Sequence, residues 1–132
     1  MTIYPAKENK ALLVCGETYH IYNKAVGSEL LFRTDEDYQY FLNKMSRFIL
    51  PIANIYAYCL IPNHFHLLLK IREVNEMAGL AKVDEENHSK YLSSIFGNFF
   101  NSYSKSYNKI YDRQGRLFIQ PFKRKSVEDY FL

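Results

Sequence analysis

The sequence predicts an α+β domain with the element order β-α-β-β-α-β, and two kinds of pattern support this fold class. Residues 35–50 and 88–111 repeat apolar side chains at helical spacing, which is typical of amphipathic helices. Residues 18–26 and 54–72 are instead rich in β-branched and aromatic side chains, which favour strands. With a last strand near the end of the chain, this order corresponds to a ferredoxin-like split βαβ fold, an antiparallel sheet with both helices on one face.

The first strand and the first helix have clear boundaries. Gly27 marks a turn after the strand. Thr34 precedes three acidic residues, and a threonine N-cap followed by acids in the first turn is a good helix start. The helix should end before Pro51, because the residue that precedes a proline disfavours helical backbone.

The apolar segment that follows is expected to form a hairpin. Pro62 and Asn63 interrupt it, so we expect two antiparallel strands, 54–61 and 64–72, joined by a tight turn. A polar loop should then connect the hairpin to the second, longer helix.

The whole chain, residues 1–132, is expected to form one domain. Residues 117–127 should be the final strand, at an edge of the sheet because they include a proline, and residues 126–132 resemble the start of another helix. No apolar run is long enough to span a membrane and no secretory signal is present, so a cytoplasmic protein is expected. Cys15 and Cys59 are expected to be buried thiols rather than a disulfide.

The positive charge is concentrated near the C-terminus. Between residues 105 and 125 there are seven basic residues and one acidic residue, Asp112. Such a segment suits a phosphate backbone, although a solvated helix face followed by a basic surface strand would look the same. The basic residues are Lys105, Lys109, Arg113, Arg116, Lys123, Arg124 and Lys125.

Two histidines stand out in the second strand of the hairpin. His64 and His66 are two positions apart, so both imidazoles should lie on one face of the strand and Phe65 on the other. Neighbouring imidazoles can bind one metal ion through one nitrogen each. A pair alone does not complete a coordination shell, and two hydrogen-bonded histidines without a metal are the simpler alternative.

Four segments together resemble a known family. The segments CLIPNHFHLLLK, YHIYNKAV, NSYSKSYNK and GRLFIQPFKRK are similar to those of the single-tyrosine HUH transposases, in the transposase IS200-like family, and in particular to the REP-associated tyrosine transposases. The resemblance covers residues 18–127. It implies the ferredoxin-like fold, a Mg²⁺ or Mn²⁺ ion bound by two histidines, and a tyrosine that attacks single-stranded DNA.

The resemblance also implies roles for individual residues. His64 and His66 would bind the metal ion, and Tyr103 would be the nucleophile, with Tyr107 as the rival one turn later. The family's third metal ligand is a polar residue about one helical turn after the tyrosine. Here that position is Tyr107, a poor ligand for Mg²⁺, which departs from the family pattern, and the next residue, Asn108, is assigned instead. Without the resemblance, Tyr103 would be assigned to the core, because it continues the apolar stripe of the second helix.

The implied reaction is nicking of single-stranded or hairpin DNA and strand transfer. Attack by the tyrosine gives a covalent 5′-phosphotyrosine intermediate and a free 3′-hydroxyl, while the metal ion polarises the phosphate. The basic residues would follow the DNA backbone, and a homodimer is compatible with such a site. Family members usually continue beyond the position of Leu132, so the domain is expected to end early.

Two other functions stay open at this point. The chain could be a relative that binds hairpin DNA without cutting it, although the presence of His64, His66 and Tyr103 favours cleavage. It could also be a ferredoxin-like RNA-binding module or RNA endonuclease, in which histidines act as acid and base. Two adjacent potential ligands favour metal binding over that alternative.

Overall fold

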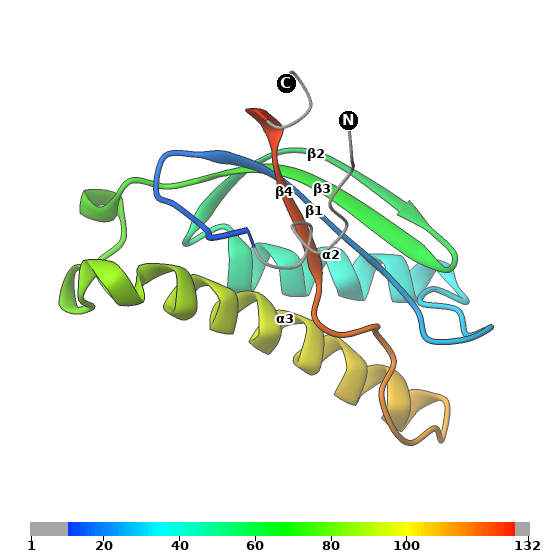
Figure 1. Cartoon of the computed structure of the whole chain (residues 1–132). Coiled ribbons are helices and arrows are strands. Elements are labelled where there is room, and N and C mark those ends of the chain that lie inside the picture. Colours follow the sequence, from blue (N-terminus) through cyan, green and yellow to red (C-terminus); the bar gives the residue numbers. More distant parts are fainter. Residues whose placement is uncertain (1–10, 129–132) are drawn as a thin grey trace.

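The computed structural model describes residues 11–128 (Figure 1). In chain order, the strands and long helices alternate as β-α-β-β-α-β, and short 3-10 turns fill the segment between β3 and α3. The bounds are β1 Thr18–Lys24, α2 Asp35–Ile49, β2 Ala53–Ile61, β3 His64–Ile71, α3 His88–Ile110 and β4 Lys123–Ser126.

The four strands form one antiparallel sheet in the order β2-β3-β1-β4. Figure 1 shows α2 and α3 side by side beneath one face of this sheet, while neither helix covers the other face. The core lies between the helices and the sheet. The predicted fold class, an antiparallel sheet with helices on one face, is confirmed.

The predicted helix start is confirmed in atomic detail. The hydroxyl of Thr34 accepts a hydrogen bond from the backbone N–H of Asp37, and the Asp37 carboxylate accepts one from the backbone N–H of Thr34. This reciprocal capping box satisfies two N–H groups that the helix itself leaves unpaired. The predicted turn at Pro62 and Asn63 is also confirmed, because β2 ends at Ile61 and β3 begins at His64.

The end of the sheet differs from the prediction. Only Lys123–Ser126 pairs as a strand, whereas the sequence pattern predicts one over residues 117–127. Pro121 lacks the N–H that a ladder needs, and before it Phe118 makes an isolated bridge to Ala25. The predicted edge position is correct, since β4 is an outer strand. Of the predicted helix start at 126–132, residues 129–132 lie outside the described residues.

Both cysteines are free thiols, as expected, but their predicted burial is wrong for Cys59. Cys15 is half-buried, whereas Cys59 is exposed on the outer strand β2. No helix within residues 11–128 is both long enough and apolar enough to cross a membrane.

Candidate functional site on the open face of the sheet

Strand β3 separates two chemically different surfaces. Phe65, Leu67 and Leu69 are 0% exposed and belong to the core. His64 and His66 alternate with them and are half-buried on the other face. The predicted placement of both imidazoles on one face, opposite Phe65, is confirmed.

The strand register identifies the other residues of that face, because directly paired residues share one side of a sheet. We call the side without helices the open face. It includes His64, His66, Leu68 and Lys70 of β3, His20, Tyr22 and Lys24 of β1, Cys59 of β2, and Lys123 and Lys125 of β4.

The imidazole of His66 lies in a stack of rings. Its centroid is 5.0 Å from that of His20 and 5.8 Å from that of Tyr22, and the three rings are close to parallel. Nδ1 of His66 shares a 2.8 Å hydrogen bond with Nε2 of His20. Burial, and then the nearby His64, lowers the pKa of His66. The neutral imidazole, which is the form that binds a metal ion, is therefore favoured.

The imidazole of His64 is held by its neighbour in the chain. Nδ1 of His64 is 2.8 Å from Oδ1 of Asn63, and the rings of His64 and His66 are 5.2 Å apart at a steep angle. In both histidines the hydrogen bond uses Nδ1, so a metal ion would have to bind through Nε2. No sequence pattern points to His20 or Asn63, because only the sheet register and the turn geometry bring them to the pair.

The donor set fits part of a metal site. Imidazole nitrogens suit first-row transition ions, whereas Mg²⁺ prefers oxygen ligands, so Mn²⁺ fits this pair better than Mg²⁺. Within residues 11–128, no group of three or more His, Cys, Asp or Glu side chains converges on one point. His64 and His66 could therefore hold an ion only if further ligands, such as water or a phosphate, complete its coordination.

Within one chain, the structure does not place Tyr103 beside the histidines. Tyr103 is 2% exposed and lies on the helix side, with its ring against Phe41 and Phe118. Phe65 packs against the same two rings, on the side of β3 opposite the imidazoles. The Tyr103 hydroxyl donates to the carbonyl of Leu31, and burial raises its pKa. This arrangement opposes the ionisation that a nucleophile needs.

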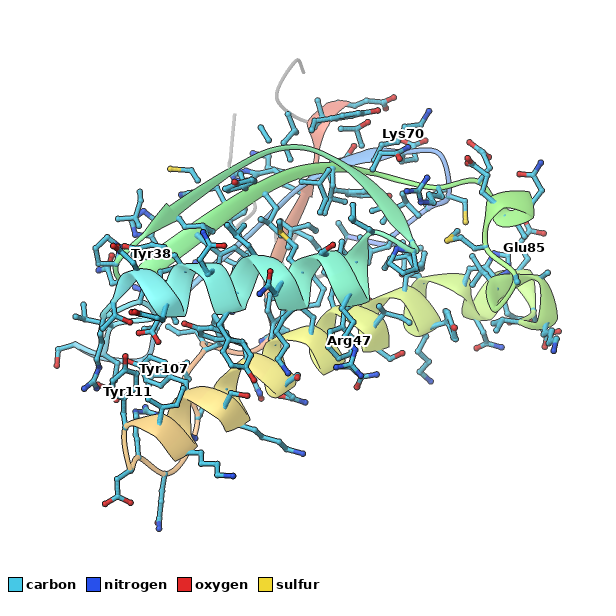
Figure 2. All side chains as sticks on the ribbon, turned by 180° about the vertical axis from the view of Figure 1, so that it is seen from behind. Tyr38, Arg47, Lys70, Glu85, Tyr107 and Tyr111 are labelled. Atoms are coloured by element: carbon cyan, nitrogen blue, oxygen red, sulfur yellow. The ribbon has the colours of Figure 1, made fainter. Side chains whose placement is uncertain are left out.

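Tyr107, the rival nucleophile, is also a core residue. It is 2% exposed, and its hydroxyl donates to the carbonyl of Leu30 and accepts from Nε of Arg33. Figure 2 shows Tyr107 on the helix side, near the C-terminal end of α3, and Lys70 on the opposite side of the sheet.

From the helix side, the two tyrosines nevertheless stabilise the loop that contacts the turn before His64. Their hydroxyls hold the carbonyls of Leu30 and Leu31, and the N–H of Leu31 donates to the carbonyl of Pro62 at 2.7 Å. Pro62 belongs to the hairpin turn that precedes His64. The tyrosines of α3 thus fix a loop that in turn fixes the start of β3.

Asn108, the predicted third metal ligand, is also elsewhere. Its side-chain N–H donates to the carbonyl of Gly115, and its Oδ1 accepts from Nη1 of Arg113. Arg113 in addition forms an ion pair with Glu29. Both side chains close the turn after α3 on the helix side, so within one chain Asn108 does not lie with His64 and His66.

The predicted basic segment is divided between two surfaces. Lys123 and Lys125 lie on the open face, and Nζ of Lys123 is 5.9 Å from the centre of the Tyr22 ring. Arg124 points the other way and donates to Ser93 of α3 at 2.7 Å. Lys105 and Lys109 lie on α3, which packs on the helix side of the sheet, and Arg116 follows the end of α3; all three are exposed.

The charged side chains that the strands contribute to the open face are all positive. The strands β1, β2, β3 and β4 contain no Asp or Glu. Lys24 pairs with His64 across the sheet, and Lys70 lies further along β3. Together with Lys123 and Lys125, these lysines place positive charge on the same face as the histidine pair. Lys24 and Lys70 are not among the predicted site residues, although strand alternation places Lys70 on the side of His64 and His66.

Comparisons with known proteins support the fold and not the individual residues. The sequence matches no protein-family profile and no curated protein. The structure is similar to a solved structure of a REP-associated tyrosine transposase bound to a REP hairpin, with a TM-score of 0.55 and 13% sequence identity. The match covers 99% of this chain and 67% of that chain. The resemblance predicted from the sequence motifs is therefore confirmed at the level of the fold.

Proposed function

We propose that the chain is a DNA-processing protein of the HUH type, which binds single-stranded or hairpin DNA on the open face of its sheet. His64 and His66 would hold a divalent ion, Mn²⁺ or Mg²⁺, beside one DNA phosphate. The observation that carries the proposal is the pair of imidazoles, each with Nδ1 engaged, on a sheet whose strands carry lysines and no carboxylates.

The chemistry follows from these side chains. A bound divalent ion neutralises charge at the scissile phosphate and makes phosphorus more electrophilic. Lys24, Lys123 and Lys125 attract and orient the backbone on either side of that phosphate. The solved structure that resembles this fold is of a transposase bound to a hairpin. Because transposases act on DNA, that similarity favours DNA over RNA as the ligand.

Covalent nicking through a phosphotyrosine remains part of the proposal, but it needs a tyrosine hydroxyl on the open face. Tyr103 could serve only after leaving the core and giving up its bond to Leu31. We therefore propose that any covalent step uses another tyrosine. The burial of Tyr103 also favours the alternative of a protein that binds hairpin DNA without cutting it.

The test is incubation of the chain with labelled single-stranded hairpin DNA and Mn²⁺, followed by a denaturing gel. Cleavage that is abolished by EDTA, by His64→Ala and by His66→Ala supports the proposal. Peptide mapping of a covalent adduct identifies the tyrosine that carries the DNA. Tight binding without cleavage would establish the binding-only alternative, and cleavage in EDTA would exclude the metal mechanism. The same assay with an RNA hairpin of matched sequence tests whether the chain acts on DNA or on RNA.

A further inference from the structure

We propose that His20 and Asn63 are positioning residues, which hold the rings of His66 and His64 with their protons on Nδ1 and a lone pair on each Nε2. The inference deepens the proposed function, because it rests on these two histidines being the metal ligands. It concerns side chains that the resemblance to HUH transposases does not assign.

For His64, the chemistry of the partner fixes the direction of the hydrogen bond. The atom 2.8 Å from Nδ1 of His64 is the amide oxygen of Asn63, which can only accept. Nδ1 must therefore donate. In a neutral ring with its proton on Nδ1, Nε2 carries the lone pair that a metal ion requires.

For His66, two directions are chemically open. If Nδ1 of His66 donates to Nε2 of His20, then Nε2 of His66 has a lone pair. If His20 donates instead, the proton of His66 is on Nε2 and the ring cannot bind a metal ion there. We infer the first direction, since it gives His64 and His66 the same tautomer. Outer hydrogen bonds orient histidine ligands in this way in metal centres.

Both positioning residues are themselves held in place. The ring of Tyr22 stacks on His20 with a centroid distance of 4.2 Å. The carbonyl of Asn63 accepts from the N–H of Ala25, and the neighbouring carbonyl of Pro62 accepts from Leu31 and Phe32. The hydrogen-bond acceptors for His66 and His64 therefore sit on a paired strand and on a turn tied to the adjacent loop.

The first experiment measures the tautomers directly in the metal-free protein. The chain has four histidines, so ¹⁵N spectra of the rings can be assigned with single histidine variants. We expect His64 and His66 to carry their protons on Nδ1 at neutral pH. Replacing Asn63 by alanine should mix the two tautomers of His64 and leave His66 unchanged. A proton on Nε2 of His66 in the wild-type protein would overturn the inference for His20.

The second experiment measures binding of Mn²⁺ alone by electron paramagnetic resonance. Loss of an outer hydrogen bond to a histidine ligand weakens metal binding by roughly tenfold or more, so we expect that loss for His20→Leu. His20→Gln keeps an oxygen that can accept from His66 and should recover most of the affinity. His88→Ala is the matched control, because His88 bonds to Val83 beside the start of α3.

The outcomes separate this inference from the proposed function. Equal Mn²⁺ affinity for wild type and His20→Leu overturns the positioning role of His20, while the metal site itself survives. Equal affinity for wild type and His64→Ala shows that Mn²⁺ does not use the pair, which contradicts the proposed function. In that case the ¹⁵N spectra, which report the tautomers of His64 and His66 in the metal-free protein, still decide whether His20 and Asn63 position the two rings.

Discussion

The open face of the sheet and its helix-covered face are formed by the same strands but carry different side chains, polar and charged on the open face and apolar on the covered face. On the covered face, Phe65 and Leu67 are fully buried, and the Phe65 ring packs against aromatic rings of α2 and α3. On the open face, His64 and His66 alternate with them and share the surface with lysines. The face of the sheet to which a side chain points therefore determines its role more than its position in the sequence does. Arg124 and Lys125, for example, are neighbours in the chain and serve different faces.

The largest difference between the faces should appear in stability. Phe65→Ala removes a fully buried ring from the aromatic core and should lower the free energy of unfolding by about 3–5 kcal/mol. His66→Ala, one residue later on the open face, should lower it by less than about 1 kcal/mol. Urea unfolding of both variants measures the two effects. A large loss for His66→Ala would mean that its ring is a structural element.

DNA binding, unlike stability, should depend on the open face and not on the helix side. Replacing Lys123 and Lys125 by glutamine should flatten the dependence of log affinity on log salt by about 0.7 for each phosphate that is no longer neutralised, with a single-stranded oligonucleotide as the ligand. The matched control replaces Lys105 and Lys109 of α3, which should leave the slope unchanged. If the control flattens the slope and the first variant does not, DNA binds on the helix side.

A smaller effect is expected from the hydroxyl of Tyr103. Tyr103→Phe keeps the buried ring and removes the hydrogen bond to Leu31, which should lower the free energy of unfolding by about 1 kcal/mol. Any covalent DNA adduct that the wild-type chain forms should still form, and Tyr107→Phe should behave alike. A folded Tyr103→Phe protein that binds DNA but forms no adduct would restore Tyr103 as the nucleophile.

Much of the fold could be predicted because its signals are local. The Thr34 cap, the turn at Pro62 and Asn63, and the alternation around Phe65 each depend on a few neighbouring residues. The shortened last strand could not be predicted in the same way, because ladder pairing beside Pro121 depends on the partner strand.

The site could be predicted only in part. The common face of His64 and His66 follows from the period of a strand, whereas the partners His20 and Asn63 depend on sheet register and turn geometry. The family resemblance assigns Tyr103 a role that its own apolar pattern opposes. The buried position that the pattern indicates is the one found in the structure.

The central claim, that the open face is the DNA surface, can be tested most directly by lysine acetylation with and without a bound DNA hairpin, read by mass spectrometry. Binding on the open face should protect lysines of the strands and leave those of α3 reactive. The residues expected to be protected are Lys24, Lys70, Lys123 and Lys125, and those expected to remain reactive are Lys105 and Lys109. Protection of Lys105 and Lys109, with the strand lysines still reactive, would contradict the account.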